Sequence, residues 1–185
     1  MPYRVPYAVG LLFFKAKRRW VLDTMARQKE RQNGLPSVSD REVESMRRQA
    51  KAQLPARLAA LAERHGFTYN KVTIKHNATN WGSCSNKGNI NLNLNIVRLP
   101  KALQDYVLLH ELCHLRHHDH GHAFHLLLEH MLTDNLMEAL NQSDQSHSDA
   151  DIAVAKEIAR KAAASRAKYP LHYVMHNAIK SYRLL

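Results

Sequence analysis

The chain has 185 residues, of which 45% are hydrophobic and 23% are charged, and its formal net charge is +11. This length allows one well-buried core and leaves little room for a second full domain. No apolar segment approaches the ~18 residues needed to cross a bilayer, and two cysteines are too few for a disulfide framework. The short apolar run at 8–14 precedes its basic residues, whereas a secretory signal has them first. We therefore expect no membrane association and a cytoplasmic location.

The positive charge is concentrated at the two ends of the chain. Residues 1–65 carry a net charge of +8 and residues 148–185 carry +4, whereas residues 66–147 carry −1. A basic surface of this kind can attract nucleic acid through salt-dependent, sequence-independent contacts. The same distribution is also typical of solvated helix faces with no binding role. The sequence leaves both interpretations open.

The N-terminal part is predicted to be helical. Residues 11–32 suit a basic helix, and a second helix is expected from Ser39 to His65. Its start is marked by a capping box formed by Ser39 and Glu42, and Gly66 marks its end. Pro55 predicts a kink or a break within this helix.

Between residues 67 and 97 the pattern changes to strands. Val72 and Ile74 alternate with polar residues, and residues 89–96 alternate strictly between asparagine and an aliphatic residue. The turn at 85–88 separates these segments. We expect the aliphatic residues of 89–96 to pack inwards and the asparagines to face solvent or substrate. As an edge strand, this segment can hold an extended peptide, although a polar sheet face without a binding role fits equally well.

The remaining elements are predicted to be helices. One begins at Pro100, which suits the first helical position, and another spans about 122–133. A polar loop follows at 141–148. The tail is expected to be helical over 149–168, to break near Pro170 and to resume to about Ser181. We expect one α+β domain over 1–147, including the N-terminal helices, and a basic helical extension over 148–185.

His110 and His114 carry the most informative pattern, H-E-x-x-H, with Glu111 between them. On a helix, residues i and i+4 lie on one face, so two imidazoles can bind one ion. The carboxylate beside them can then take a proton from water at that ion. The pattern can also arise by chance in a chain with 13 histidines, or mark a solvated helix face. Apolar neighbours favour a buried helix, in which an unpaired glutamate is costly unless it serves a metal site.

A catalytic zinc usually has three protein ligands and water, so a third ligand is required. His118 would lie about 12 Å along the helix from His110, which is too far for one ion, and His117 fails for nearly the same reason. His120 can reach if the helix stops at Asp119-His120-Gly121 and the chain turns back. We therefore choose His120. The weaker candidates lie on the following helix: His122, His125, Glu129 and Glu138.

Several further motifs accompany this pattern in order along the chain, and together they resemble the YgjP-like metallopeptidase domain family. This family is related to the SprT-like and WLM groups of zincins. The resemblance covers about residues 15–142. The matching segments are Trp81-Gly82-Ser83-Cys84-Ser85, Gly88-Asn89-Ile90-Asn91-Leu92-Asn93, Leu99-Pro100, Asp105-Tyr106-Val107, His110-Glu111-Leu112-Cys113-His114-Leu115, His120-Gly121 and Phe124.

The resemblance implies a zincin-like α+β fold, in which a small antiparallel sheet of about three strands packs on the H-E-x-x-H helix, with additional helices at both ends. It also implies that His110, His114 and His120 are the metal ligands and that Glu111 is the catalytic glutamate. Zn²⁺ is the expected cofactor. The chain differs from the family in having His125 where an aromatic residue is usual after Phe124.

Three functions from different classes follow from these observations. The first is a zinc-dependent metallopeptidase that acts on a peptide or protein. The second is a zinc-dependent nucleotide pyrophosphatase, because that activity is attached to some relatives. The third is a DNA-associated protease of the SprT-like type, for which the basic flanking helices would bind nucleic acid. The sequence does not identify the substrate or the oligomeric state.

Overall fold

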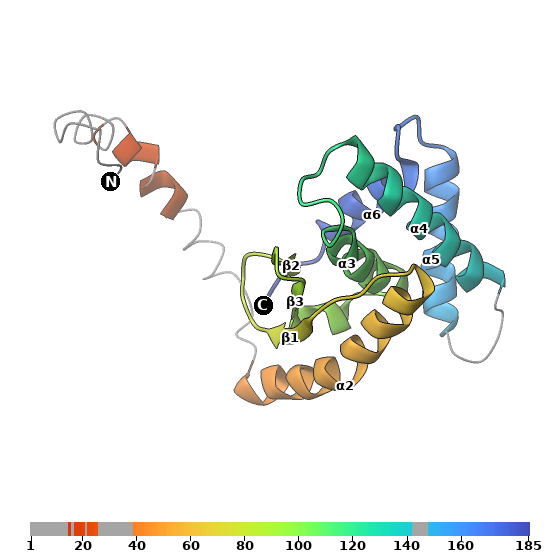
Figure 1. Cartoon of the computed structure of the whole chain (residues 1–185). Helices are drawn as coiled ribbons and strands as arrows, with labels where there is room; N and C mark the ends of the chain where they lie inside the picture. Colours follow the sequence, from red (N-terminus) through yellow and green to blue (C-terminus); the bar gives the residue numbers. More distant parts are fainter. Residues whose placement is uncertain (1–14, 16, 21, 26–38, 142–147) are drawn as a thin grey trace. The chain divides into compact units, whose positions relative to one another are not determined.

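The computed structural model describes residues 15, 17–20, 22–25, 39–141 and 148–185. Its contacts divide the chain into two units, Met1–Ser39 and Asp40–Leu185. In the first unit the described residues 15, 17–20 and 22–25 are helical, and the rest of the helix predicted at 11–32 lies outside the described residues. Most of the polar loop predicted at 141–148 also lies outside them. The elements that carry the candidate site all belong to the second unit (Figure 1).

Helix α2 spans Asp40–Arg64 without a break. It begins directly after Ser39, as the capping box predicts, and ends before Gly66, whose φ of +66° requires a residue without a β-carbon. Pro55 lies inside the helix and does not end it. The packing of Leu54 and Leu58, both fully buried, offsets the lost backbone hydrogen bond, which costs ~3 kcal/mol.

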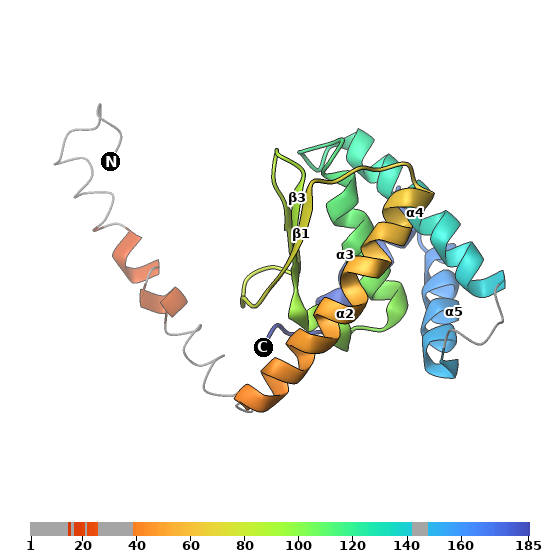
Figure 2. The same cartoon turned by 60° about the horizontal axis from the view of Figure 1, so that its bottom comes forward.

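The sheet has three strands: β1 (Lys71–Lys75), β2 (Gly82–Cys84) and β3 (Asn89–Asn93). Their order is β1-β3-β2, so β3 is the central strand. It lies beside β1 (Figure 2) and pairs parallel with it. It pairs antiparallel with β2, so the expectation of an antiparallel sheet is wrong for one of the two pairings. Because β3 is paired on both sides, it cannot be the edge strand that holds a peptide.

The strand predicted over 89–96 ends at Asn93, and residues Leu94–Arg98 form a short 3₁₀ helix, η1. The side chain of Asn93 accepts a hydrogen bond from the backbone N–H of Asn95 at 3.0 Å, which caps η1 and competes with strand pairing. Asn93 and Asn95 are buried, against the expectation that the asparagines face solvent or substrate. Asn93 donates to the backbone carbonyls of Asn77 and Asn80. Its role is therefore structural.

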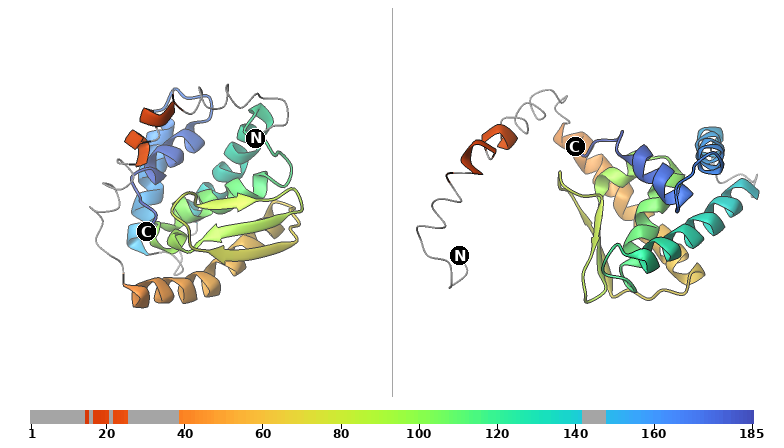
Figure 3. Two further views of the ribbon diagram at one scale, coloured as in Figure 1. Left: turned by 90° about the vertical axis from the view of Figure 1, so that its left-hand side faces the viewer. Right: turned by 90° about the horizontal axis from the view of Figure 1, so that it is seen from above.

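Four helices complete the unit: α3 (Lys101–Cys113), α4 (His122–Asn141), α5 (Asp149–Ala163) and α6 (Pro170–Ile179). The helices lie on one side of the sheet (Figure 3). Helix α2 contacts β1, and α3 contacts β2 on one side and α4, α5 and α6 on the other. Helix α3 is thus the central element, and Leu108, Leu109 and Leu112 on it are fully buried.

A partly buried ion pair and a neighbouring asparagine connect α2, α3 and α4. Arg57 of α2 donates two hydrogen bonds to the carboxylate of Asp105 on α3, at 2.8 and 2.6 Å. Asn135 of α4 donates a third, at 2.8 Å. The pair holds the pKa of the Arg57 guanidinium above its usual value, because the hydrogen bond to Asp105 outweighs the cost of burial. It fixes α3 relative to α2 and α4.

The α+β class, the three-stranded sheet and its packing on the H-E-x-x-H helix are confirmed. None of the described helices is long and apolar enough to cross a membrane. Helices α5 and α6 are in contact with α3 and α4, and the end of the chain returns to the sheet side, where the backbone N–H of Leu185 donates to Asn95 at 3.2 Å.

Candidate metal and catalytic site

The end of α3 brings the three predicted histidines together. The helix ends at Cys113, and His114 is its C-cap residue, so the helix stops earlier than the stop predicted at residues 119–121. The chain then turns through residues 114–121 before α4 begins at His122. This turn returns His120 to the last turn of α3, which is the geometry that its selection as third ligand required.

The three imidazoles form a nearly equilateral triangle. The ring centroids of His110 and His114 are 5.0 Å apart, those of His110 and His120 are 5.0 Å apart, and those of His114 and His120 are 4.7 Å apart. One ring nitrogen of each lies within 4.8 Å of the other two. The Nε2 atoms of His110 and His120 are 3.1 Å apart, close to the ~3.3 Å expected for two nitrogen ligands of one tetrahedral zinc. The donor set fits such an ion.

Two neighbours hold the rings in this arrangement. Phe124 of α4 is fully buried, and its ring centroid lies 5.0, 4.8 and 4.7 Å from those of His110, His114 and His120. The Nδ1 atom of His114 lies 3.1 Å from the backbone carbonyl of His117. An N–H at that position donates to the carbonyl and leaves the Nε2 lone pair for a metal, as outer partners of ligating histidines commonly do.

Glu111 lies against strand β2. Its side chain is 5% exposed, and a β-carbon added to Gly82 would lie 2.6 Å from its Oε1 atom and 2.8 Å from its Cδ and Cγ atoms. Only glycine leaves room for the carboxyl group at this position. The strand and the helix thus determine together where the carboxylate lies.

The electrostatics of the site follow from its burial. Burial raises the pKa of Glu111 to about 8, which makes its carboxylate a better proton acceptor near neutral pH. Burial, together with the neighbouring His114 and His120, lowers the pKa of His110 to about 3. A neutral imidazole is the form that binds a metal.

Polar atoms without a partner are concentrated here. Among the described residues, five buried side-chain N or O atoms have no hydrogen-bond partner, and three of them belong to this region: Nδ1 of His110, Oε2 of Glu111 and Nδ1 of His125. Native proteins leave few buried polar groups unpaired, and those they leave often serve a ligand or a reaction. This concentration is independent support for a functional site.

The weaker ligand candidates have other partners. The Nδ1 atom of His122 is in contact with the hydroxyl of Tyr169, and the ring of His125 lies 4.6 Å from that of His172. Glu129 accepts hydrogen bonds from the backbone of α6. Glu138 forms an ion pair with Arg64. The structure does not bring any of them into the triangle, and His118 is exposed.

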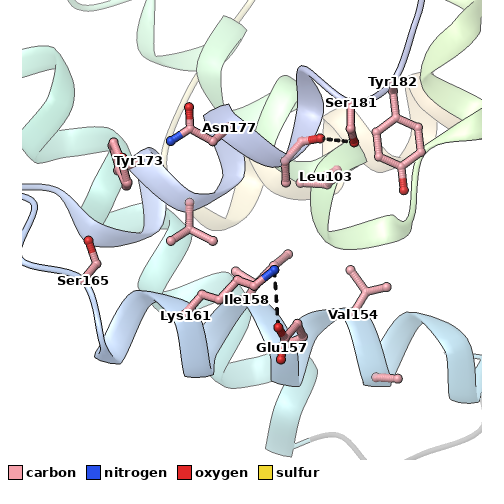
Figure 4. A pocket seen from close by; sticks show the side chains of 13 residues that line it. Leu103, Val154, Glu157, Ile158, Lys161, Ser165, Tyr173, Asn177, Ser181 and Tyr182 are labelled. Atoms are coloured by element: carbon pink, nitrogen blue, oxygen red, sulfur yellow. Dashed lines mark hydrogen bonds and ion pairs between the residues drawn. The ribbon is translucent and has the colours of Figure 1, made fainter.

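A separate groove lies between α5 and α6 (Figure 4). Its volume is about 830 Å³, and its mostly apolar lining includes Leu103, Ile158 and Tyr173. No member of the histidine triangle lines it, and neither does Glu111. This groove and the histidine site are therefore different features of the molecule.

Sequence reasoning missed three parts of the site. It did not foresee that Gly82 would pack against Glu111, although the motif containing Gly82 was noted. It assigned no role to Tyr106, whose ring lies 6.1 Å from that of His110, or to His172, on a helix about sixty residues away. The spacing of four residues between Tyr106 and His110 on one helix is a local signal for the first of these contacts. No local pattern indicates the contacts of Gly82 or His172, because only the tertiary packing creates them.

Comparisons with known proteins identify the family. The model of the family described as "YgjP-like, metallopeptidase domain" matches residues 34–143, which is more than half of the chain. No curated protein matches. Among solved structures, the crystal structure of the metallopeptidase zymogen abylysin from Pyrococcus abyssi is similar at 20% identity. The similarity covers 49% of this chain and 95% of that chain, with a TM-score of 0.36. On the strength of the family match, the chain belongs to the YgjP-like metallopeptidase domain family.

Proposed function

We propose that the protein is a zinc-dependent metallopeptidase in which His110, His114 and His120 hold the ion and Glu111 is the general base. The observation that carries this proposal is the triangle of imidazoles beside a buried glutamate with an unpartnered oxygen. Three histidines that leave one position open are the ligand set of catalytic rather than structural zinc sites.

Each residue has a distinct role in this proposal. When bound, zinc would act as a Lewis acid that polarises the scissile carbonyl and lowers the pKa of a water molecule. Glu111 accepts a proton from the attacking water through its unpartnered carboxylate oxygen and returns it to the leaving amine. Gly82 keeps the Glu111 carboxyl in place, and Phe124 keeps the three rings in place.

Strand β2 is the edge on which we expect an extended peptide to pair. Within the described residues, it pairs with β3 alone, so the backbone groups of its other edge are available for a further strand. Gly82 of this strand contacts Glu111. A peptide added along β2 would thus pass beside the proposed base.

The decisive experiment compares the wild-type protein with Glu111→Gln. We expect both to contain one zinc ion per chain by metal analysis, and the variant to cleave a casein-derived fluorogenic peptide about 10²–10⁴-fold more slowly, the usual contribution of a general base. The exposed His118 provides a matched control, because His118→Ala should change neither property. Full activity of Glu111→Gln would contradict the role of Glu111.

The same preparations distinguish the other two functions that follow from the sequence. Nothing in the described residues favours a nucleotide or nucleic acid over a peptide as partner. We expect no hydrolysis of nucleoside triphosphates and no DNA binding that falls steeply with salt. Hydrolysis of nucleotides that depends on Glu111 would replace the peptidase proposal.

A further inference from the structure

A second group of histidines lies beside the metal triangle. The ring of His125, on α4, lies 6.4 Å from that of His120 and 4.6 Å from that of His172, on α6. The ring of His176, one turn further along α6, lies 5.5 Å from that of His172. Helix α6 lies outside the residues that the family model matches. The imidazoles of α6 thus come to the neighbourhood of the metal site from beyond the matched residues.

The buried hydroxyl of Tyr106 connects the two groups. Tyr106 precedes His110 by one turn of α3, and its hydroxyl oxygen lies 3.3 Å from Nδ1 of His172 and 3.4 Å from Nδ1 of His176. One hydroxyl can donate to one of these nitrogens and accept from the other. When Tyr106 donates to the nearer and more buried His172, the proton of that neutral ring is at Nε2. His172 is then a hydrogen-bond donor on the side away from Tyr106.

Helix α6 is held in register by Glu129. The carboxylate of Glu129, on α4, accepts hydrogen bonds from the backbone N–H groups of Leu171 and His172 at 2.8 and 2.9 Å. These are unpaired donors of the first turn of α6, and a carboxylate at a helix N-terminus is also favoured by the helix dipole. Because the backbone N–H of His172 is itself one of the two, this contact fixes the position of His172 relative to the active-site helices.

A hydrogen-bond donor can add to the charge stabilisation that a metal held by the triangle would supply during peptide hydrolysis. The carbonyl oxygen of the scissile peptide becomes an oxyanion in the transition state, and a preorganised donor aimed at it contributes about 10²–10³ in kcat. We propose that His172 donates a hydrogen bond to this oxyanion and that Tyr106 and Glu129 position it, so that α6 completes the active site. This inference rests on the proposed function. His172 is half-buried and its backbone is held by Glu129, whereas His176 is exposed and has only the contact with Tyr106 in common with it.

The test compares two inhibitors with one peptide sequence. A phosphinic peptide presents a tetrahedral anion that resembles the oxyanion, whereas a mercaptoacyl peptide binds zinc through sulfur and presents no oxyanion. By calorimetry, we expect His172→Ala to weaken binding of the phosphinic peptide about 10- to 100-fold, the value of a hydrogen bond to a charged group. Binding of the mercaptoacyl peptide and the zinc content should not change. In turnover, kcat should fall about 10²–10³-fold with little change in KM.

Three further variants separate a direct role from a structural one. His172→Gln keeps a donor near the position of Nε2 and should recover part of the phosphinic affinity. Glu129→Gln should weaken binding of the phosphinic peptide and not of the mercaptoacyl peptide, because the charge at the N-terminus of α6 is lost. The loss of affinity should be smaller than in His172→Ala. Tyr173→Ala is the control, since Tyr173 is the next residue and lines the α5–α6 groove (Figure 4). Tyr173→Ala should bind both inhibitors with wild-type affinity.

The results distinguish failure of this inference from failure of the proposed function. If His172→Ala weakens both inhibitors equally, or neither, His172 is not the oxyanion donor, whatever the behaviour of Glu111. If the wild-type protein contains no zinc, or Glu111→Gln is fully active, the proposed function itself fails.

Discussion

Gly82→Ala tests the contact between strand β2 and the proposed base. The backbone φ of Gly82 lies outside the left-handed region, since only Gly66 and Gly88 have positive φ among the described glycines. Alanine can therefore adopt the conformation of Gly82. The three atoms nearest to the new β-carbon all belong to the side chain of Glu111, at 2.6–2.8 Å.

The size of the effect follows from that distance. The optimal separation of non-bonded carbon atoms is ~3.5–4.0 Å. The carboxyl group of Glu111 must therefore move by about 1 Å away from the new β-carbon. Overpacking of this kind costs ~1–3 kcal/mol, or roughly 4–8 °C in Tm for about 2 kcal/mol in a domain of this size. A misplacement of about 1 Å in a catalytic group can lower the rate about 10²-fold. We expect both losses together.

A double-mutant cycle assigns the clash to Glu111. In Glu111→Ala the obstructing side chain is absent, so Gly82→Ala should no longer destabilise. It should even stabilise by ~0.4–1 kcal/mol, because alanine lowers the entropy of the unfolded chain. Thermal denaturation of the four proteins measures the cycle, and peptide cleavage with metal analysis measures the activity of Gly82→Ala. Equal destabilisation in both backgrounds, or an active and stable Gly82→Ala variant, would refute the reasoning.

Two further predictions concern stability. Arg57→Met leaves the buried carboxylate of Asp105 without its cation, and we expect a loss of about 2 kcal/mol in the free energy of unfolding by urea titration. This is less than the ~3–5 kcal/mol of a fully buried pair, because 42% of the Arg57 side chain is exposed. Arg160→Met, on a solvated face, should show no change and serves as control. Removal of metal with a chelator should lower Tm by roughly 10 °C, and added zinc should restore it. A metal present at about 1,000 times its Kd stabilises the folded protein by ~4 kcal/mol, and this stabilisation is lost with the metal. His114→Ala should show no chelator-dependent shift, and an equal shift in that variant would show that the ion binds elsewhere.

The fold was predictable where local rules decide the structure. The boundaries of α2 followed from a cap and a glycine, and the burial of α3 followed from the apolar residues that surround the H-E-x-x-H pattern. The strand predicted over 89–96 failed at Asn93, because an asparagine side chain that caps η1 competes with strand hydrogen bonds. The strand order could not be predicted from the alternation of polar and aliphatic residues, because this pattern is the same in an edge strand and in a central strand.

The sequence by itself predicted which residues in and just after α3 make up the candidate site. The spacing of His110 and His114 is a property of one helix, and His120 followed from the reach of a chain that turns back after that helix. Tertiary structure alone decided what surrounds them: Gly82 against Glu111, Phe124 under the three rings, and His172 of α6 near the site. The physical reason is that helical spacing fixes neighbours within one or two turns, whereas contacts between distant segments depend on how buried faces pack together.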